Sequence, residues 1–394
     1  MASIRPNSLL FTVILGVFAA LPPLAIDLSA PTLPLLPAKL ATTETVAGLT
    51  LSLFMVGFAL GQLCAGPWSD ERGRRPVLLS GLACFVCSGV GCTLAPSGLV
   101  LALSRLIQGC GAGACAVIAF AMVQDLFEGD VARTKRSYVA TIFAATPIAA
   151  PAAGSLLVNL FGWRSVHAVL SVLGLSLLMI TWLGIVESRR PRSATNLTRG
   201  DMAGRLYKDI PFLRVAVANA LSYGVIFVYI AASPLVIIGQ LGYSSTVFAS
   251  VFASTALALT LGAWTNGHLS RRGIGPHVLI NPAFIGTIIA TAVLALAGVT
   301  DTRPAYVVVP LLMAVLFARG ILAPNLQHIA IERGRERAGV ASAMVGVSQL
   351  LSGAGASAIV AALLPAFGLK AVVVAMAVLA AAALAIWRRV ERSI

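Results

Sequence analysis

The sequence predicts an all-α membrane protein with twelve transmembrane helices in two halves of six, and three observations support this fold class. Of the 394 residues, 58% are hydrophobic and only 11% are charged, whereas water-soluble domains carry about 25% charged residues. Apolar runs of roughly 20 residues, the length that spans a bilayer, follow one another along the whole chain. A short charged motif near residue 70 recurs in weaker form near residue 270.

The predicted spans form two sets of six. They are residues 9–33, 46–68, 76–96, 98–125, 138–160 and 164–186, then 212–238, 245–266, 276–298, 304–328, 338–364 and 370–388. Helices are expected because backbone polar groups in lipid are satisfied only in helices or closed barrels, and the alternation typical of barrel strands is absent. The first run follows Arg5 and could instead be a secretory signal. That alternative leaves eleven spans and places the basic loops outside, so we expect a retained first helix.

The longest polar stretch, Glu187 to Asp209, separates the two sets of spans. Its Arg, Ser, Thr and Gly residues are typical of a flexible linker. We therefore predict an N-terminal half at residues 1–187, a cytoplasmic linker at 188–211 and a C-terminal half at 212–394.

Positive charge is concentrated in alternate predicted loops. Most of the 28 Lys and Arg residues lie at the two termini and in every second loop, while the intervening loops hold only Lys39, Arg164, Arg303 and Lys370. The positive-inside rule then places both termini in the cytoplasm, for a multi-pass protein of a bacterial inner membrane. A formal net charge of +14 would suggest nucleic acid as a partner in a soluble protein. Here no polar, aromatic-rich region is available to bind bases, so we expect none.

The charged motif at residues 66–76 interrupts the apolar sequence between the second and third spans. Its glycines and prolines predict a sharp cytoplasmic turn, and its arginines resist crossing the membrane. Asp70 and Asp125 are both predicted at cytoplasmic helix ends, so an acid–base cluster with the motif's arginines is expected. The alternative is a simple topology anchor, which would need the arginines but neither Asp70 nor the glycines.

This motif resembles G-x-L-A-D-R-x-G-R-R/K, the loop signature of the major facilitator superfamily, with Trp68 and Ser69 at the Leu and Ala positions. Parallel six-helix halves are the layout of such transporters. The resemblance implies that the motif is a latch between the halves in one conformation. The second copy, at residues 266–273, has Ser270 in place of the acid, so any latch is expected to be asymmetric. The gating residues expected from the resemblance in this region are Gly66, Asp70, Arg72, Gly73, Arg74 and Asp125.

The fourth span carries Arg105, an expensive residue in lipid unless it faces a polar cavity or partner. Gln108 lies one turn further on the same face, and Gly109 and Gly113 form a small surface for close helix packing. The stretch is similar to the R-x-x-Q-G-x-G-A motif of proton-coupled members of the superfamily. The alternative is that Arg105 extends along the helix to the outer headgroups.

Asp27 is the only acid well inside an apolar run. The first and fourth spans run in opposite directions, and both Asp27 and Arg105 are predicted in the outer half. A buried carboxyl group can bind and release a proton as its access to water changes, and a nearby arginine would tune this exchange. The surrounding sequence resembles the L-A-x-D-x-x-x-P-x-L-P signature of the drug:proton antiporter group. The alternative is a helix-end residue wetted by the outer loop.

The fifth span contains Pro147, Pro151 and Gly154 among small residues, which predicts a bent and closely packed helix. The form A-P-I-x-A-P-x-x-G resembles the bicyclomycin and chloramphenicol resistance (Bcr/CflA) branch of the antiporter group. The resemblance extends over nearly the whole chain, and it implies a gating role for these three residues.

Arg319 departs from the pattern of that branch and has no acid within reach on its own helix. Snorkelling to the headgroups and contact with substrate explain it equally well. The other candidates for a substrate cavity come from helices that line the pathway in the resembled fold, although ordinary packing also explains each of them. With Arg319, the cavity candidates are Phe54, Met55, Gln108, Asn219, Tyr223, Tyr229 and Asn325.

Together these residues predict a proton-coupled secondary transporter that exports small amphipathic drugs, with Asp27 and Arg105 in proton coupling. The four histidines lack metal-ligand spacing, and the sequence shows neither a nucleotide-binding loop nor a catalytic triad pattern. We therefore expect no metal, no cofactor and no enzymatic activity, with a proton gradient as energy source and a monomer in the bilayer. The alternatives are an exporter or facilitator of a sugar or amino acid on the same fold, and a non-transporting membrane receptor or scaffold.

Overall fold

The structure is a computed structural model that describes residues 4–188, 209–297, 305–333 and 338–392. Every regular element in these ranges is helical, and twelve helices are long and apolar enough to cross a membrane. The prediction of an all-α protein with twelve membrane-spanning helices is therefore confirmed for the part of the chain that the structure describes. The predicted linker at 188–211 falls largely on residues 189–208, which lie outside the described residues.

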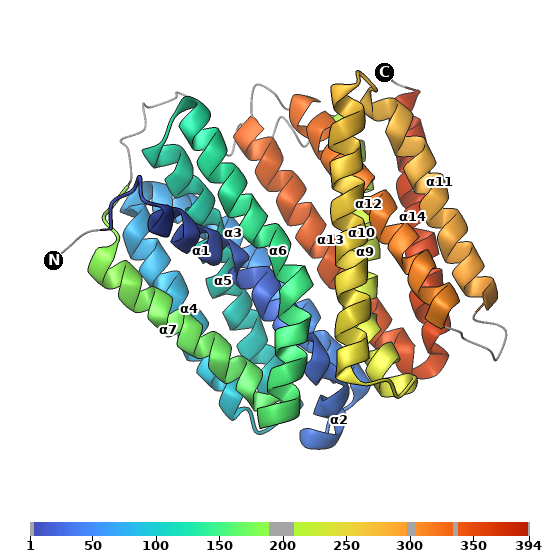
Figure 1. The fold of residues 1–394 in the computed structure, drawn as a ribbon, viewed down its shortest axis with the longest axis horizontal. Helices are drawn as coiled ribbons and strands as arrows, with labels where there is room; N and C mark the ends of the chain where they lie inside the picture. Colours follow the sequence, from blue (N-terminus) through green and yellow to red (C-terminus); the bar gives the residue numbers. More distant parts are fainter. Residues whose placement is uncertain (1–3, 189–208, 298–304, 334–337, 393–394) are drawn as a thin grey trace. The chain divides into compact units, whose positions relative to one another are not determined.

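The chain divides into two compact units, one of residues 1–193 with 242–249 and the other of residues 194–241 with 250–394. The first unit contains a first span made of α1 (Leu9–Ser29), the 3₁₀ helix η1 (Ala30–Leu35) and α2 (Leu36–Lys39) (Figure 1). Its further helices are α3 (Glu44–Arg72), α4 (Arg74–Leu94), α5 (Gly98–Leu126), α6 (Gly129–Phe161) and α7 (Arg164–Gly184). Within this unit, α3 packs on α5, α1 on α6, and α4 on both α5 and α7.

The helices of the second half begin with α9 (Ile210–Pro234), which continues into the short π-helical segment η2 (Leu235–Gln240). They go on with α10 (Ser245–Arg271), α11 (Pro276–Ala297), α12 (Ala305–Arg333), α13 (Ala338–Phe367) and α14 (Leu369–Glu391). In the second unit α9 packs against α12, α13 and α14, and a core that includes Phe212, Phe284 and Trp387 fills the space between them.

Polar side chains fix where several helices begin. The hydroxyls of Ser8, Thr43 and Ser97 accept hydrogen bonds from the backbone N–H three residues later, at the starts of α1, α3 and α5. The carboxylate of Asp209 does the same at the start of α9, where it accepts from the N–H of Phe212 at 3.0 Å. These caps satisfy N–H groups that have no partner within the first turn of a helix.

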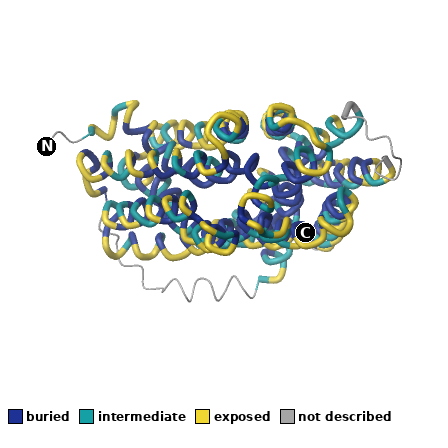
Figure 2. Tube along the Cα trace, turned by 90° about the horizontal axis from the view of Figure 1, so that it is seen from below, coloured by how far each residue is buried: buried dark blue, intermediate teal, exposed yellow. Residues whose placement is uncertain are grey.

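Exposed and buried residues alternate along the helices of each unit (Figure 2), and many of the exposed residues are large and apolar. The exposed set includes Leu99, Val172, Trp182, Trp264, Ile289 and Val378. Water-soluble proteins rarely expose so many large apolar groups together. A bilayer is the solvent in which such a surface is stable.

The helices extend further than the predicted spans at several ends. Helix α6 begins at Gly129 rather than near residue 138, and α12 continues to Arg333 rather than ending near 328. The extra turns carry charged residues such as Asp130, Arg133 and Glu332. Hydropathy marks only the apolar part of a helix, so it misses turns that continue beyond it.

The predicted sharp turn over residues 66–76 is wrong in extent, because Gly66 to Arg72 belong to α3 and α4 begins at Arg74. Gly73 alone makes the turn, with φ of 101°, and its N–H donates to the carbonyl of Ser69 at 3.1 Å. A positive φ costs glycine nothing, so one residue suffices to reverse the chain direction.

Candidate proton-coupling site and charged cluster

Asp27 lies in the last turns of α1 and is 2% exposed. It has no hydrogen-bond or ion-pair partner among the described residues. The helix ends two residues later and continues as η1, whose Pro31 and Pro34 do not favour a regular α-helix. The alternative of a helix-end residue wetted by the outer loop does not fit this low exposure.

Arg105 of α5 contacts α1 at Ser29, two residues after Asp27. Its Nη2 donates to Ser29 Oγ at 3.2 Å, and its Nη1 donates to Gln108 Oε1 at 2.9 Å. The guanidinium also lies over the ring of Phe54, 4.3 Å from its centroid. With 2% exposure, Arg105 is enclosed rather than snorkelling toward a headgroup. Arg105 forms no ion pair with Asp27, so any effect of the arginine on this carboxyl group acts through space and through Ser29.

Helices α1 and α6 pack closely beside Asp27. A Cβ atom placed on Gly154 of α6 would overlap the carbonyl oxygen of Leu28, the residue that follows Asp27. Pro147 and Pro151 lie inside the same helix. The predicted close packing of this helix is therefore present at the depth of Asp27, and the gating role of the three residues stays a prediction.

Arg74 is the centre of the charged cluster at the α3–α4 turn. Its Nη1 contacts Asp70 Oδ1 at 2.6 Å, and its Nε donates to Asp125 Oδ2 at 2.7 Å. The arginine thus bridges α3, α4 and α5 at one end of the first unit. Arg72 lies outside the cluster, exposed and 5.6 Å from the centroid of the Trp68 ring. The gating role predicted for these residues, and for Gly66, is not tested by this geometry.

Glu187 joins this cluster, although the sequence analysis placed it only at the start of the linker. One carboxylate oxygen accepts from the backbone N–H of Arg74 at 2.8 Å, and the other accepts from that of Arg75 at 3.1 Å. The carboxylate therefore caps the N-terminus of α4, where negative charge is favourable. A side chain on Gly73 would overlap this carboxylate, so the glycine is needed for the contact as well as for the turn.

The Glu187→Ala variant is expected to lower the free energy of unfolding by about 1 kcal/mol, the usual effect of losing a helix cap. Glu187→Gln, which keeps one acceptor oxygen, should lose less. Thermal unfolding of the purified protein in detergent measures both. Equal midpoints for the wild type and both variants would contradict the capping role.

In the second half four of the five predicted cavity residues are buried and Tyr223 is half-buried, and most have partners within their own unit. The Tyr229 hydroxyl lies 2.8 Å from Thr255 Oγ1, and Asn325 Nδ2 donates to Asn266 Oδ1 at 2.6 Å. Arg319 lies 5.7 Å from the centroid of the Tyr223 ring. Asn219 is fully buried, and neither polar atom of its amide has a partner among the described residues. The arrangement groups Tyr223 with Arg319, and the role of all five in substrate binding stays a prediction.

In the first unit, Phe54 and Gln108 contact Arg105 directly, and Met55 is fully buried. Sequence reasoning missed Ser29, Glu187 and Asn266 as partners of the residues it selected. The signal for Glu187 was present, because an acid directly after a span faces the basic loops on the same side. Ser29 and Asn266 carried no such signal, since small polar residues are common in transmembrane helices.

Comparison with known families decides the identity of this fold. The model of the Major Facilitator Superfamily matches residues 12–357. The chain belongs to the major facilitator superfamily. Among its relatives in that superfamily, the uncharacterized MFS-type transporter YdgK of Bacillus subtilis is 31% identical over 347 residues, which are 86% of this chain and 85% of YdgK.

Two further members of the superfamily have more specific names. The chloramphenicol resistance protein of Pseudomonas aeruginosa is 32% identical over 285 residues, 71% of this chain and 66% of that protein. The multidrug resistance protein MdtL of Escherichia coli is 30% identical over 234 residues, 59% of this chain and 60% of MdtL. The matched region thus covers less than two thirds of each of these two relatives.

Solved structures of the superfamily share the fold. A bacterial homolog of the human lysosomal transporter Spinster, in an inward-facing and occupied conformation, has a TM-score of 0.78 and 17% identity, over 100% of this chain and 98% of that one. A D-xylose-proton symporter has a TM-score of 0.75 and 18% identity, over 96% of this chain and 98% of that one. At these identities the likeness establishes the fold alone. The protein is a multi-pass membrane protein of a transporter family.

Proposed function

We propose that the protein exports small amphipathic, drug-like compounds in exchange for protons. Its relatives include proteins named for chloramphenicol resistance and for multidrug resistance. The motifs around Asp27, Arg105 and Pro151 resemble those of drug:proton antiporters over the same region. The neighbouring D-xylose symporter is too distant in sequence, at 18% identity, to favour a sugar as the substrate.

The observation that carries the proposal is the enclosed and unpaired carboxyl group of Asp27. Acids within transmembrane segments are costly and usually belong to ion or proton pathways. In the proposed cycle, Asp27 binds a proton in one conformation and releases it when rocking of the two halves changes its access to water. Arg105 would hold Ser29, and with it the end of α1, in a fixed position relative to α5.

We also propose the location and orientation of the protein, its energy source and its oligomeric state. Both termini would face the cytoplasm of a bacterial inner membrane, as the distribution of Arg and Lys favours. The proton gradient would supply the energy without a bound cofactor, and the working unit would be a monomer in the bilayer.

A transport assay tests the function. A susceptibility panel on a pump-deficient bacterial host that expresses the protein selects the compound, beginning with chloramphenicol. Flux of that compound is then measured in proteoliposomes with and without an imposed pH gradient. Gradient-driven export supports the proposal. Flux of a sugar or amino acid instead, or gradient-independent flux of the drug, would overturn it, and no flux of any compound would favour a receptor or scaffold.

A further inference from the structure

Arg319 lies midway along α12, and its side chain is enclosed within the second unit. The residue is 4% exposed. Its Nε and Nη1 are buried and have no acceptor among the described residues, and it forms no ion pair with a described acid. Snorkelling does not explain this position, because a snorkelling arginine would reach water, and contact with a substrate stays a prediction. Arginine stays charged in proteins, so the positive charge needs another partner.

The contrast with Arg105 shows what is missing at Arg319. Both guanidinium groups are buried, and both lie near an aromatic ring, Phe54 for Arg105 and Tyr223 for Arg319. Arg105 donates to two protein oxygens, whereas two nitrogens of Arg319 donate to none among the described residues. Leaving buried donors of a charged group unpaired is costly, so a group other than the described residues should accept these hydrogen bonds.

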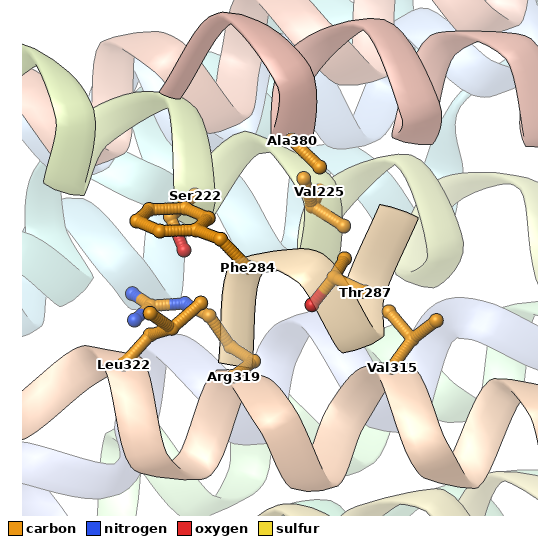
Figure 3. A pocket seen from close by; sticks show the side chains of 8 residues that line it. All are labelled: Ser222, Val225, Phe284, Thr287, Val315, Arg319, Leu322 and Ala380. Carbon is orange, nitrogen blue, oxygen red and sulfur yellow. The ribbon is translucent and has the colours of Figure 1, made fainter. Parts of the chain in front are cut away.

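A small cavity adjoins the guanidinium and is drawn in Figure 3. Its volume is about 10 Å³, close to the least that holds one water-sized particle. Four helices of the second unit enclose it. The lining residues are Ser222 and Val225 of α9, Phe284 and Thr287 of α11, Val315, Arg319 and Leu322 of α12, and Ala380 of α14.

The polar groups that line this cavity favour an anion. The Ser222 hydroxyl points toward the guanidinium in Figure 3, and as a donor it would add to the two unpartnered nitrogens of Arg319. The Thr287 hydroxyl donates to the carbonyl of Ala283 at 2.9 Å, so it is not available as a donor. No lining residue is acidic. A cation would be repelled here, and a water molecule would satisfy donors without balancing the charge.

We propose that the cavity beside Arg319 binds one small monovalent anion of halide size, which in the cell would be chloride. A chloride ion is somewhat larger than a water molecule, so the lining side chains must move slightly apart to admit it, whereas a sulfate, a phosphate or an organic acid would need far more room. The anion neutralises the buried guanidinium and joins α12 to α9 through Arg319 and Ser222. This site is independent of the compound exported and of the proton carrier, since it lies wholly in the second unit and Asp27 lies in the first.

The test is chloride-dependent thermal stability of the purified full-length protein, without drug and without a pH gradient. Sodium chloride replaces sodium gluconate at constant ionic strength and pH. We expect the unfolding temperature of the wild type to rise by about 2 to 4 °C with saturation, as ligand binding to the folded state requires. Arg319→Met should lose the chloride response. The matched variant Arg105→Met, which removes a buried arginine of the first unit, should retain it.

A second measurement does not depend on the folding of any arginine variant. Crystals of the wild type grown in bromide should show one anomalous peak between Arg319 and Ser222, and Ser222→Ala should weaken the halide response several-fold. Equal stability in chloride and gluconate, an unchanged response in Arg319→Met, or no bromide peak at this place would each overturn the proposal. Stabilisation by a carboxylate-bearing export substrate but not by chloride would also overturn it, in favour of a substrate site.

Discussion

Asp27→Asn is expected to abolish proton-driven export while leaving the fold intact. Asparagine has nearly the same shape and fits the same enclosed position in α1, but it cannot bind and release a proton. In proteoliposomes with an imposed pH gradient, export of the compound selected above should fall by about tenfold or more, the range expected when coupling between two sites is lost. Equilibrium exchange of labelled compound without a gradient should continue, because the rocking of the halves is not itself removed.

A surface acid supplies the matched control. Asp130 in the first turn of α6 has a side chain that is 91% exposed and forms only a surface pair with Arg133. Such pairs contribute little, so Asp130→Asn should export at the wild-type rate. If Asp27→Asn kept full gradient-driven export, Asp27 would not be the proton carrier. If it lost exchange as well as export, its role would be structural or in substrate binding.

The spans could be predicted from the sequence because each depends on a local property, the length of an apolar run. Hydropathy placed the start of α5 at residue 98 and that of α7 at residue 164, where the structure has them. It failed where helices continue past their apolar part, as α6 does through Asp130 and Arg133. In that region charged side chains are compatible with a helix in water, so composition no longer reports the helix boundary.

Residue types also indicated part of the candidate site. A buried acid and a buried arginine are costly in lipid, so Asp27 and Arg105 could be selected from their types alone. Their partners could not, because contacts such as that of Arg105 with Ser29 depend on how each helix is rotated about its axis. For the same reason, the surroundings of Arg319 could not be predicted. Helix α12 is apolar on most of its circumference, so the sequence does not indicate that Arg319 faces α9, α11 and α14.

The glycine contact between α3 and α5 could be predicted only in part. The small-residue surface of Gly109 and Gly113 was predicted, and the structure shows α3 packed directly against it. The glycines that complete the contact from α3, Gly57 and Gly61, show the same four-residue spacing but were not recognised. Pairs of glycines four residues apart allow transmembrane helices to approach closely.

Gly109→Ala is accordingly expected to lower the free energy of unfolding by about 3 kcal/mol, the upper part of the range for overpacking a close contact. The new Cβ would overlap the carbonyl oxygen of Phe54 and lie 2.9 Å from the backbone nitrogen of Phe58. Both atoms belong to the backbone of α3, so no side chain can move aside and the two helices must separate. Equilibrium unfolding in mixed detergent and SDS micelles measures the loss.

The same change should reach the candidate site, because Phe54 also carries the ring that lies 4.3 Å from the Arg105 guanidinium. Displacing α3 withdraws this ring and loosens the arginine that holds Ser29, so gradient-driven export should fall together with stability. Gly286→Ala is the matched control, since Gly286 of α11 is exposed and an added Cβ meets no atom within 4 Å. If Gly109→Ala were as stable as Gly286→Ala, the contact between α3 and α5 would be looser than the structure has it. The position of Arg105 would then depend on Gln108 and Ser29 alone.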